Sequence, residues 1–582
     1  MKSLEIEFRD NFLFKSLKFI AFENRKVYIF LFVFFEFMDK EIEKFALHNA
    51  VKYNGKANPG AVIGQVFSQY PEMKNKASEI SKKVNEIIAK VNKLPLEEQR
   101  KQLMKIAPEL LEEKKEKKKK DLPELKNIKG KIVTRIPPEP SKYIHLGHAM
   151  SFLINYLYAK KYNGKCVLRF DDTNPEKAKK EYYDSIEQDL KWLKIDFDKK
   201  VIASEHMDEF YKYGIQLIKD NHAYVCFCNQ EKMRDYRETS KICNHREQTI
   251  QKTLELWEEM LKGKYKEGEI TLRLRGDMSN ANAVMRDPVL FRIVEKPHVL
   301  TGKKYRVWPM YDFESAVGEQ ITGVTHIFRS NEFGQMRIDL QNYIKSLLGF
   351  RIQEELQYGR ITIKGYETQG RVIREKIEKG EVDGWDDPRL MTIMALRRRG
   401  IVPETFQELV YEVGLSPTQT NLDWSLVASI NRKLIDPTAK RYFFVKNPKK
   451  IKIKNNIKSV KIPLHPENKE LGMKTINFED EFYIQDELEK NKVYRFMHLF
   501  NFKDKNFISE EYDQKLGTKI IHAVPAKDAI DVEVLMDDGS ILKGKGEAAL
   551  KDLKEGEIIQ FERMFFCRLD NKKKMLFIYT HD

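Results

Sequence analysis

Two histidines flank a glycine in the segment TRIPPEPSKYIHLGHAM, which covers residues 134–150. Three prolines stiffen the chain ahead of His145, Gly147 and His148, and an apolar helical pattern follows. The first N–H groups of a helix have no partner inside the helix, so they attract phosphate. Imidazoles can donate hydrogen bonds to negative charge on a phosphate, and a glycine lets a flat group approach the backbone. The spacing predicts a phosphate-handling site, with two unrelated helix-start histidines as the alternative.

A second group has the residue types and spacing of a metal site. Cys226 and Cys228 are two residues apart, and so are Cys243 and His245. Residues two apart on a strand face the same side, so each pair could bind one ion. Four sulfur and nitrogen ligands suit a closed structural site, and four unconnected side chains are the alternative. We expect a structural Zn²⁺ at these residues.

These residues need a scaffold, and the hydrophobic pattern of the surrounding chain indicates one. Strand-like runs at 131–136 and 166–170 alternate with helical patterns at 146–162 and 178–193. Such alternation predicts a parallel, doubly wound α/β sheet. Sheets of this kind bind ligands at the carboxyl ends of their strands, which is where the histidines begin a helix.

The rest of the chain changes its hydrophobic period and charge several times, which predicts a multidomain protein. An alternating run that turns at Asp538-Gly539 predicts a hairpin. The charged linker at 112–129 is expected to be solvated, and a phosphate-contacting arm is the alternative. The expected parts are an atypical extension at 1–37, a helical N-terminal domain at 38–111, a charged linker at 112–129, two halves of the α/β domain at 130–225 and 307–350, an insert at 226–306, a helical region at 351–440 and an all-β antiparallel region at 441–582.

The extension contains an apolar run, residues 27–38, that is about half as long as a membrane-spanning helix. The run includes Glu36 and ends in large residues, whereas a signal peptide ends in small ones. We therefore expect no membrane role, and we interpret residues 1–37 as an upstream start outside the working protein.

The composition indicates a polyanionic partner. The 582 residues carry a formal net charge of +16, and the sequence pI is about 9.1. Nucleic acid is the first candidate, and a generally lysine-rich proteome is the alternative explanation. Five cysteines in so long a chain exclude a disulfide scaffold and indicate a reducing, cytoplasmic location.

The segment around the histidines resembles the nucleotide-binding signature of class I aminoacyl-tRNA synthetases, in their glutamyl and glutaminyl branch. The resemblance extends to LRFDDTNPEKAKKEY, VWPMYDFESAV, ITGVTHIFRSNEF, GWDDPRL, ALRRRGI, NRKLIDPTAKRYFFV and VPAKDAIDVEVLM. The stretch ALHNAVKYNGKANPGAVIGQV is similar to the helical appendage of archaeal glutamyl-tRNA synthetases. The resemblance thus covers the chain from about residue 38 to the C-terminus.

The resemblance implies a Rossmann-like catalytic domain, an insert that binds the tRNA acceptor end, a helical stem-contact region and a C-terminal pair of antiparallel β-barrels that read the anticodon. In some members, similar Cys and His spacing in the insert holds zinc. The implied reaction converts glutamate and ATP, with Mg²⁺, to glutamyl-adenylate and pyrophosphate. Glutamate then passes to the terminal adenosine of tRNA-Glu, and whether tRNA-Gln is also charged stays open. A monomer is expected.

The resemblance also implies roles for single residues. Asp171 would pair with the α-ammonium of the substrate, and Asp172 would be structural rather than half of a metal pair. Arg135 and Tyr311 would line the amino-acid pocket. Arg329 would determine which amino acid is bound. At this position the glutaminyl branch resembles a cysteine-containing pattern, whereas the glutamyl branch has an arginine.

A guanidinium such as that of Arg329 can hold a carboxylate through two charge-assisted hydrogen bonds. A glutamine amide would present its own donors to that fork, which favours glutamate. The alternative is that Arg329 is a surface arginine without a role in binding. The alternative functions are a glutaminyl-tRNA synthetase and a tRNA-binding paralogue without ligase activity.

The second signature of the family, a loop that commonly ends in Ser-Lys, departs from its pattern here. The matching stretch, residues 361–380, has no such pair. Lys364 or Arg371 could supply the missing cation. Together with His145, Gly147 and His148, these two residues complete the predicted catalytic set. Lys142 stands where the family usually has glycine, next to the first signature.

Overall fold

The computed structural model describes residues 26–110, 120–126 and 128–582, with the backbone alone for residues 26–36, 109, 333 and 514. The chain divides into two compact units, residues 1–120 and 121–582. Within the described ranges, no helix is both long enough and apolar enough to cross a membrane.

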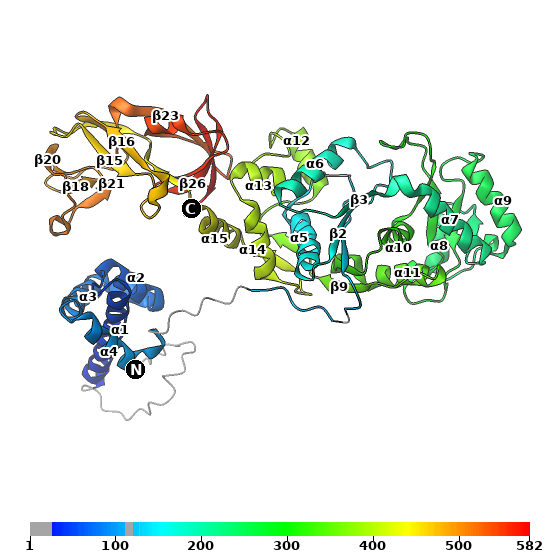
Figure 1. The fold of residues 1–582 in the computed structure, drawn as a ribbon, viewed down its shortest axis with the longest axis horizontal. Coiled ribbons are helices and arrows are strands. Elements are labelled where there is room, and N and C mark those ends of the chain that lie inside the picture. Colours follow the sequence, from blue (N-terminus) through cyan, green and yellow to red (C-terminus); the bar gives the residue numbers. More distant parts are fainter. Residues whose placement is uncertain (1–25, 111–119, 127) are drawn as a thin grey trace, which may run out of the picture. The chain divides into compact units, whose positions relative to one another are not determined.

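The first unit contains a bundle of helices (Figure 1): α1 (Lys26–Lys52), α2 (Pro59–Gln69), α3 (Ala77–Val91) and α4 (Leu96–Ile106). Asn58 caps α2 by accepting a hydrogen bond from the Ala61 N–H at 3.2 Å, and Pro59 takes the first helical position. The predicted helical pattern is confirmed, because its apolar positions are buried together: Ile42, Phe45, Ala46, Ala50, Ile80, Val84, Ile88 and Val91.

The predicted extension at 1–37 lies largely outside the described residues, as does half of the predicted linker at 112–129. Helix α1 begins at Lys26 and continues through Met38, so the helix crosses the predicted domain boundary. The Phe37 ring packs edge-on against Tyr70, with centroids 6.2 Å apart. The last residue of the extension therefore contacts the bundle.

The second unit contains five parallel strands that position the candidate site: β1 (Val133–Ile136), β2 (Lys165–Phe170), β3 (Lys199–Ile202), β8 (His326–Ser330) and β9 (Glu354–Tyr358). The Thr325 N–H donates to the Val133 carbonyl at 2.9 Å, which joins β8 to β1. The strands form two parallel sheets, β3-β2-β1 and β8-β9, next to each other at this bond. Parallel strands that alternate with helices agree with the predicted α/β class.

Helices accompany these strands (Figure 1): α5 (Leu146–Lys161), α6 (Lys180–Trp192), α10 (Tyr311–Thr322) and α11 (Gly334–Leu347). The predicted strands and helices of residues 131–193 are confirmed to within two residues at each boundary. The apolar face of α5 packs on the sheet, and Leu153, Leu168 and Ile186 are fully buried between the layers.

The predicted insert at 226–306 belongs to an antiparallel sheet with helices beside it, and this part of the fold extends beyond both predicted bounds: β4 (Ala223–Cys226), β5 (Thr271–Leu274), β6 (Val289–Ile293), β7 (Val307–Pro309), α7 (Met207–Lys219), α8 (Gln230–Glu238) and α9 (Ile250–Leu261). Its core contains two large buried aromatic side chains, Trp257 and Trp308. Strand β4 ends at Cys226, so Cys228 lies beyond the strand.

The region predicted to be helical from residue 351 begins with strands. It contains β9, β10 (Ile361–Ile363), β11 (Thr420–Leu422), α12 (Gly370–Glu378), α13 (Ile393–Arg399), α14 (Pro403–Val413) and α15 (Trp424–Ile435). β10 pairs in parallel with β11, far away in sequence. Three-residue strands are too short to display a period of two, so the sequence pattern missed them.

The C-terminal strands form open sheets, which corrects the predicted pair of closed barrels. One sheet has the order β12-β25-β26-β27-β23-β24-β13, and smaller sheets hold β14 to β22. The predicted purely antiparallel pairing is also wrong, because β12·β25, β23·β27 and β18·β21 are parallel. Alternation along a strand indicates its two faces but not its distant partner. The predicted hairpin is confirmed, since β23 and β24 pair antiparallel around Gly539, whose φ is +87°.

The strands of this region are β12 (Lys440–Tyr442), β13 (Phe444–Lys446), β14 (Lys449–Lys452), β15 (Ser459–Pro463), β16 (Met473–Asn477), β17 (Glu481–Ile484), β18 (Val493–Phe496), β19 (Asn501–Lys503), β20 (Asn506–Ser509), β21 (Lys519–Ile521), β22 (Val524–Pro525), β23 (Ala529–Leu535), β24 (Ile541–Glu547), β25 (Ile558–Phe561), β26 (Phe565–Asn571) and β27 (Leu576–His581).

Candidate functional site

The two predicted phosphate-handling histidines cap the N-terminus of α5. His145 is the cap residue, and its Nδ1 accepts a hydrogen bond from the Gly147 N–H at 3.1 Å. The Nδ1 of His148 accepts from the His145 N–H at 3.3 Å. Because both rings use Nδ1 as an acceptor, their neutral forms carry the proton on Nε2. Each Nε2–H can therefore donate to a ligand at the start of the helix.

The surroundings of these rings keep them neutral. Their centroids are 3.8 Å apart. Burial lowers the pKa of His145 to about 3, and it lowers the pKa of His148 well below the ordinary value, with Lys142 adding to both effects. Neutral imidazoles donate hydrogen bonds without adding charge. The positive charge that a polyphosphate needs must therefore come from other groups.

The neighbours of Gly147 explain why this position is a glycine. A Cβ at this position would lie 2.9 Å from the Ile361 carbonyl oxygen and 3.0 Å from the His145 ring. Backbone contact with the segment after β9 thus excludes a side chain. The approach of a flat ligand at Gly147 stays a prediction.

Backbone hydrogen bonds fix the start of α5 against a distant segment. The Leu146 N–H donates to the Met391 carbonyl at 3.0 Å, and the Ile393 N–H donates to the Ile144 carbonyl at 3.0 Å. These bonds tie the histidine cap to the segment that follows GWDDPRL. Three stretches of the chain, around residues 145, 361 and 391, therefore meet at the cap.

A buried carboxylate, Glu319 on α10, organises the basic residues beside β1 and β8. Its Oε1 accepts from the Arg135 Nε at 3.2 Å, and its Oε2 accepts from the Lys345 Nζ at 2.9 Å. Burial alone would raise the pKa of Glu319, but Lys345, Arg135 and Arg329 lower it to about 2. Glu319 is thus ionised and holds two cations in place.

Arg329 lies at the end of β8 and is also buried. Its Nη1 donates to the Gln341 Oε1 at 2.9 Å. Its Nη2 is 3.6 Å from Glu319, and its Nε is 3.3 Å from Glu355. Neither Nε nor Nη2 forms a hydrogen bond with any described residue. One edge of this buried guanidinium therefore has donors to offer a ligand.

The charges around Arg329 favour an anion. Burial raises the pKa of Glu355, although Arg329 opposes the shift. Three basic side chains, those of Arg135, Arg329 and Lys345, are paired directly with only two carboxylates, those of Glu319 and Glu355. This directly paired group keeps one positive charge in excess, and two when Glu355 is protonated.

Asp171 and Asp172, the adjacent acids after β2, have different environments. Asp171 accepts from the Arg169 Nε at 2.5 Å and from its Nη2 at 3.0 Å. Asp172 is fully buried and accepts from the Tyr183 hydroxyl and the Ser204 hydroxyl, both at 2.7 Å. Asp172 thus holds neighbouring elements together, and Asp171 is paired with Arg169.

Tyr311 begins α10 close to the same residues. Burial raises the pKa of Tyr311, while Arg329 and Arg135 oppose the shift and Asp171 adds to it. The four residues predicted to bind the amino acid, Arg135, Asp171, Tyr311 and Arg329, therefore lie in one electrostatic neighbourhood.

The two cations predicted in the second signature lie elsewhere on the surface. The Arg371 side chain is 81% exposed on α12, and its Nη1 is 3.9 Å from Glu375 on the same helix. Lys364 is exposed, and its charge acts on Asp423. A catalytic role for either residue stays a prediction.

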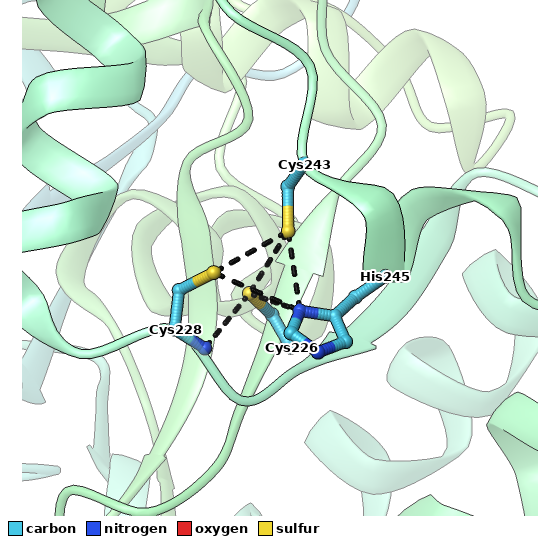
Figure 2. A group of neighbouring side chains, drawn as sticks. All are labelled: Cys226, Cys228, Cys243 and His245. Carbon is cyan, nitrogen blue, oxygen red and sulfur yellow. Dashed lines mark hydrogen bonds between the residues drawn. The ribbon is translucent and has the colours of Figure 1, made fainter.

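The four predicted metal ligands converge on one point (Figure 2). The Cys243 sulfur is 3.8 Å from Cys226 and 3.4 Å from Cys228. The His245 Nδ1 is 3.7, 3.7 and 3.2 Å from the sulfurs of Cys226, Cys228 and Cys243. A tetrahedral Zn²⁺ with ordinary bond lengths separates two sulfurs by about 3.8 Å and a sulfur from a nitrogen by about 3.6 Å. The group fits zinc.

The ligands reach this arrangement through turns rather than through two strands. Cys226 ends β4 and Cys228 lies in the turn after it, while Cys243 caps a short 3₁₀ helix that contains His245. Burial raises the pKa of Cys228 to about 12, so the thiol needs a nearby cation to ionise. The Arg273 Nη1 donates to the Cys226 sulfur at 3.6 Å from outside the group.

The sequence pattern missed three residues that organise the site: Arg169, Glu319 and Lys345. Arg169 stands two residues before Asp171 inside a buried strand, and that unusual position was the available signal. Glu319 and Lys345 are charged residues at buried positions of α10 and α11. Their partner Arg135 is 184 residues before Glu319, which no local pattern can indicate.

Comparisons with known proteins place these observations in a family. Residues 131–437 match the model for tRNA synthetases class I (E and Q), catalytic domain, and residues 439–523 match the anti-codon binding domain of the same group. A glutamate–tRNA ligase of Methanocaldococcus jannaschii is 40% identical and covers 94% of this chain and all of its own length. A glutamate–tRNA ligase of Pyrococcus furiosus is 42% identical, with the same coverage. A solved glutamate-tRNA synthetase from Elizabethkingia anophelis is 17% identical, covering 53% of this chain and 71% of its own with a TM-score of 0.39.

Proposed function

Because the chain belongs to the class I tRNA synthetases of the E and Q group, we propose that it is a ligase that attaches glutamate to tRNA at the expense of ATP. The relatives named glutamate–tRNA ligase match it over nearly its whole length. The observation that carries the choice of amino acid is the buried edge of Arg329, whose two donors have no acceptor among the described residues.

In the first step an oxygen of the glutamate α-carboxylate attacks the α-phosphorus of ATP, and pyrophosphate leaves. We place the phosphates at the start of α5, where the cap bonds through Nδ1 leave the Nε2–H groups of His145 and His148 able to donate. The cap bonds hold both rings in the donating tautomer before ATP arrives. Catalysis then depends on positioning and on charge stabilisation, without a covalent enzyme intermediate.

The amino acid binds at the carboxyl ends of β1, β2 and β8. The Nε and Nη2 edge of Arg329 receives the side-chain carboxylate, in the way that the same edge of Arg169 holds Asp171. Asp171 attracts the α-ammonium, and Arg135 and Tyr311 line the pocket. A glutamine amide would bring its own N–H donors to this edge and leave the excess positive charge unpaired.

In the second step the terminal ribose hydroxyl of tRNA takes the glutamyl group from the adenylate, and AMP leaves. The C-terminal β region corresponds to the anticodon-binding part of the family. The net charge of +16 suits a tRNA partner. Charging of tRNA-Glu is the proposed activity, and charging of tRNA-Gln is a separate property.

Two metal ions accompany this function. Cys226, Cys228, Cys243 and His245 would hold a Zn²⁺ that fixes the loops of the insert, as a closed structural site. Mg²⁺ would accompany ATP as part of the substrate and neutralise phosphate charge.

The amino-acid assignment is tested by exchange of labelled pyrophosphate into ATP, with tRNA present. Glutamate should support exchange with a specificity constant at least about 100-fold above that of glutamine, because the amide leaves buried charge unpaired. Equal exchange with both amino acids, or exchange with glutamine alone, would refute the assignment.

A further inference from the structure

Lys142 lies in the turn between β1 and α5, three residues before His145. Its aliphatic stem packs against the start of α12, since a Cβ on Gly370 would be 3.7 Å from both Cβ and Cδ of Lys142. Burial is the main cause that lowers the pKa of His145 and of His148, and the charge of Lys142 lowers both further. The ammonium therefore lies beside the histidine cap.

Among the described residues, no acid or acceptor pairs with the Lys142 ammonium. The acids that act on it, Glu139 and Glu332, are already paired with other bases. Glu139 accepts from Lys177 at 3.3 Å, and Glu332 is 2.9 Å from Arg360. Burial lowers the pKa of Lys142. A partly buried cation without a partner is stabilised when an anion binds beside it.

The other candidate cations have no such position. Arg371 is 81% exposed and faces Glu375 on its own helix. Lys364 is exposed near Asp423. Lys142 alone among these three combines a packed stem with a place at the histidines. Lys142 also supplies a positive charge for a polyphosphate, which the two neutral imidazoles cannot supply.

We propose that Lys142 is the catalytic cation that binds the β- and γ-phosphates of ATP. It takes the place of the lysine in the Ser-Lys pair, which residues 361–380 do not contain. This inference rests on the proposed function. As the carboxylate oxygen of glutamate bonds to the α-phosphorus, the bond from that phosphorus to the oxygen bridging the β-phosphate breaks. The electron pair leaves with pyrophosphate, and Lys142 stabilises the charge that accumulates there. The start of α12 carries the stem, so the ammonium is positioned before ATP binds.

The test compares Lys142→Met, Lys142→Arg and the wild type in glutamate-dependent pyrophosphate exchange, with tRNA present. Lys142→Met should lower kcat/KM for ATP by about 100-fold, since one stabilising donor is lost. Lys142→Arg, which keeps the charge, should retain at least about a tenth of the wild-type value. Lys177→Met is the matched control, because Lys177 is an exposed base that pairs with Glu139, three residues before Lys142, and its value should stay within about threefold.

Binding measurements separate a phosphate contact from a structural role. Lys142→Met should weaken binding of a non-hydrolysable ATP analogue by at least about tenfold. It should leave binding of a stable glutamyl-adenylate analogue within about threefold, because that molecule has no β- or γ-phosphate. A variant damaged in its fold would lose both ligands.

Three results would overturn the inference: exchange within threefold of wild type in Lys142→Met, equal loss of both analogues, or a 100-fold loss confined to Lys364→Met or Arg371→Met. An inactive wild type would instead contradict the proposed function itself. Normal wild-type exchange with an unimpaired Lys142→Met protein would contradict the inference alone.

Discussion

Arg329 and Arg169 present the same guanidinium edge to their surroundings, with different outcomes. Arg169 uses Nε and Nη2 to hold Asp171, whereas the Nε and Nη2 of Arg329 hold no described residue by hydrogen bonds. The guanidinium nevertheless stays fixed, because its Nη1 donates to Gln341 at 2.9 Å. The Nε and Nη2 of this fixed guanidinium make ion-pair contacts with Glu355 at 3.3 Å and Glu319 at 3.6 Å but form no hydrogen bond. They can therefore donate to a planar carboxylate with little loss of conformational freedom.

Arg329→Cys should therefore lower the specificity constant for glutamate far more than that for glutamine. The expected penalty is about 2–5 kcal/mol, because a buried substrate carboxylate loses its partner. Arg329→Lys keeps the charge but not the fork, and it should give an intermediate value. Specificity constants for both amino acids provide the measurement. A glutamate-to-glutamine ratio that stays within about twofold of the wild type would exclude Arg329 as the discriminator.

The two ring nitrogens of His148 have separate tasks that substitutions can divide. Asparagine places an oxygen near Nδ1, so His148→Asn should keep the α5 cap and lose the Nε2–H donor. Glutamine places an amide nitrogen near Nε2, so His148→Gln should lose the cap, at about 1 kcal/mol of stability, and keep the donor. His148→Asn should slow exchange by about tenfold or more with an unchanged melting temperature. A wild-type rate in this variant would contradict the assignment.

Sequence reasoning was most effective for residues whose function depends on near neighbours. The His-x-Gly-His cap and the Cys and His pairs are read from spacings of two and three residues, and the structure brings each group together. Glu319 could not be found in this way, because its partners Arg135 and Lys345 are 184 and 26 residues away. The reason for Gly147 was also inaccessible, since the Ile361 carbonyl that excludes a side chain belongs to a distant segment.

Among the elements of the insert, the segments around the Cys and His group have little hydrophobic core of their own. Helix α8 has no buried residue, and the Cys and His group lies at its base. Zinc binding energy can replace such a core, because it adds directly to folding. Protein purified without chelator should contain close to one zinc per chain, and Cys243→Ser should contain less than about a tenth of that.

Cys166→Ala is the matched control for this measurement, because Cys166 is a buried cysteine outside the group. Its zinc content should equal that of the wild type. Removal of the metal should lower the melting temperature of the wild type and leave that of Cys243→Ser unchanged. A fully active wild-type protein with almost no zinc would contradict the site.

A buried asparagine on α15 joins the helical region to the C-terminal sheet. The Asn431 Oδ1 accepts from the Val402 N–H at 2.9 Å and from the Thr405 hydroxyl at 2.8 Å. Its Nδ2 donates to the Gly400 carbonyl at 3.2 Å and to the His581 Nε2 at 2.9 Å. All of its hydrogen-bonding capacity is used across elements that are far apart in sequence.

Asn431→Ala should lower the free energy of unfolding of the second unit by about 2–4 kcal/mol, because it leaves several buried groups without partners. Denaturant unfolding of the full chain measures this effect. Asn477→Ala, an exposed position in β16, should change stability by less than about 0.5 kcal/mol. Equal effects of the two substitutions would show that the joint contributes nothing.

The elements themselves were predictable where the pattern was long. The helical patterns of α3 and α5 and the buried runs of β1 and β2 are visible in the sequence, because each is a local pattern. Strand partners were not predictable: β10 pairs with β11 across nearly 60 residues, and β12 pairs in parallel with β25. Such pairings depend on packing between distant segments, which explains why open sheets appear where closed barrels were expected.

Across the whole molecule, the candidate site residues fall in one of the two compact units. The second unit contains the cap, the amino-acid pocket, the Cys and His group and the β region, in one continuous body of 121–582. The family models cover residues 131–523 of this body. The residues that we propose for catalysis and for the selection of glutamate therefore all lie within the second unit.

The central claim is that this chain joins glutamate, and not glutamine, to tRNA. The most direct measurement uses the full chain with ATP, labelled glutamate or glutamine, and purified tRNA-Glu or tRNA-Gln, and counts the label that becomes attached to tRNA. The predicted result is attachment of glutamate to tRNA-Glu, with glutamine attached at least about 100-fold less efficiently to either tRNA. Glutamine attached as efficiently as glutamate, or no attachment of glutamate by the folded, zinc-loaded protein, would contradict the account.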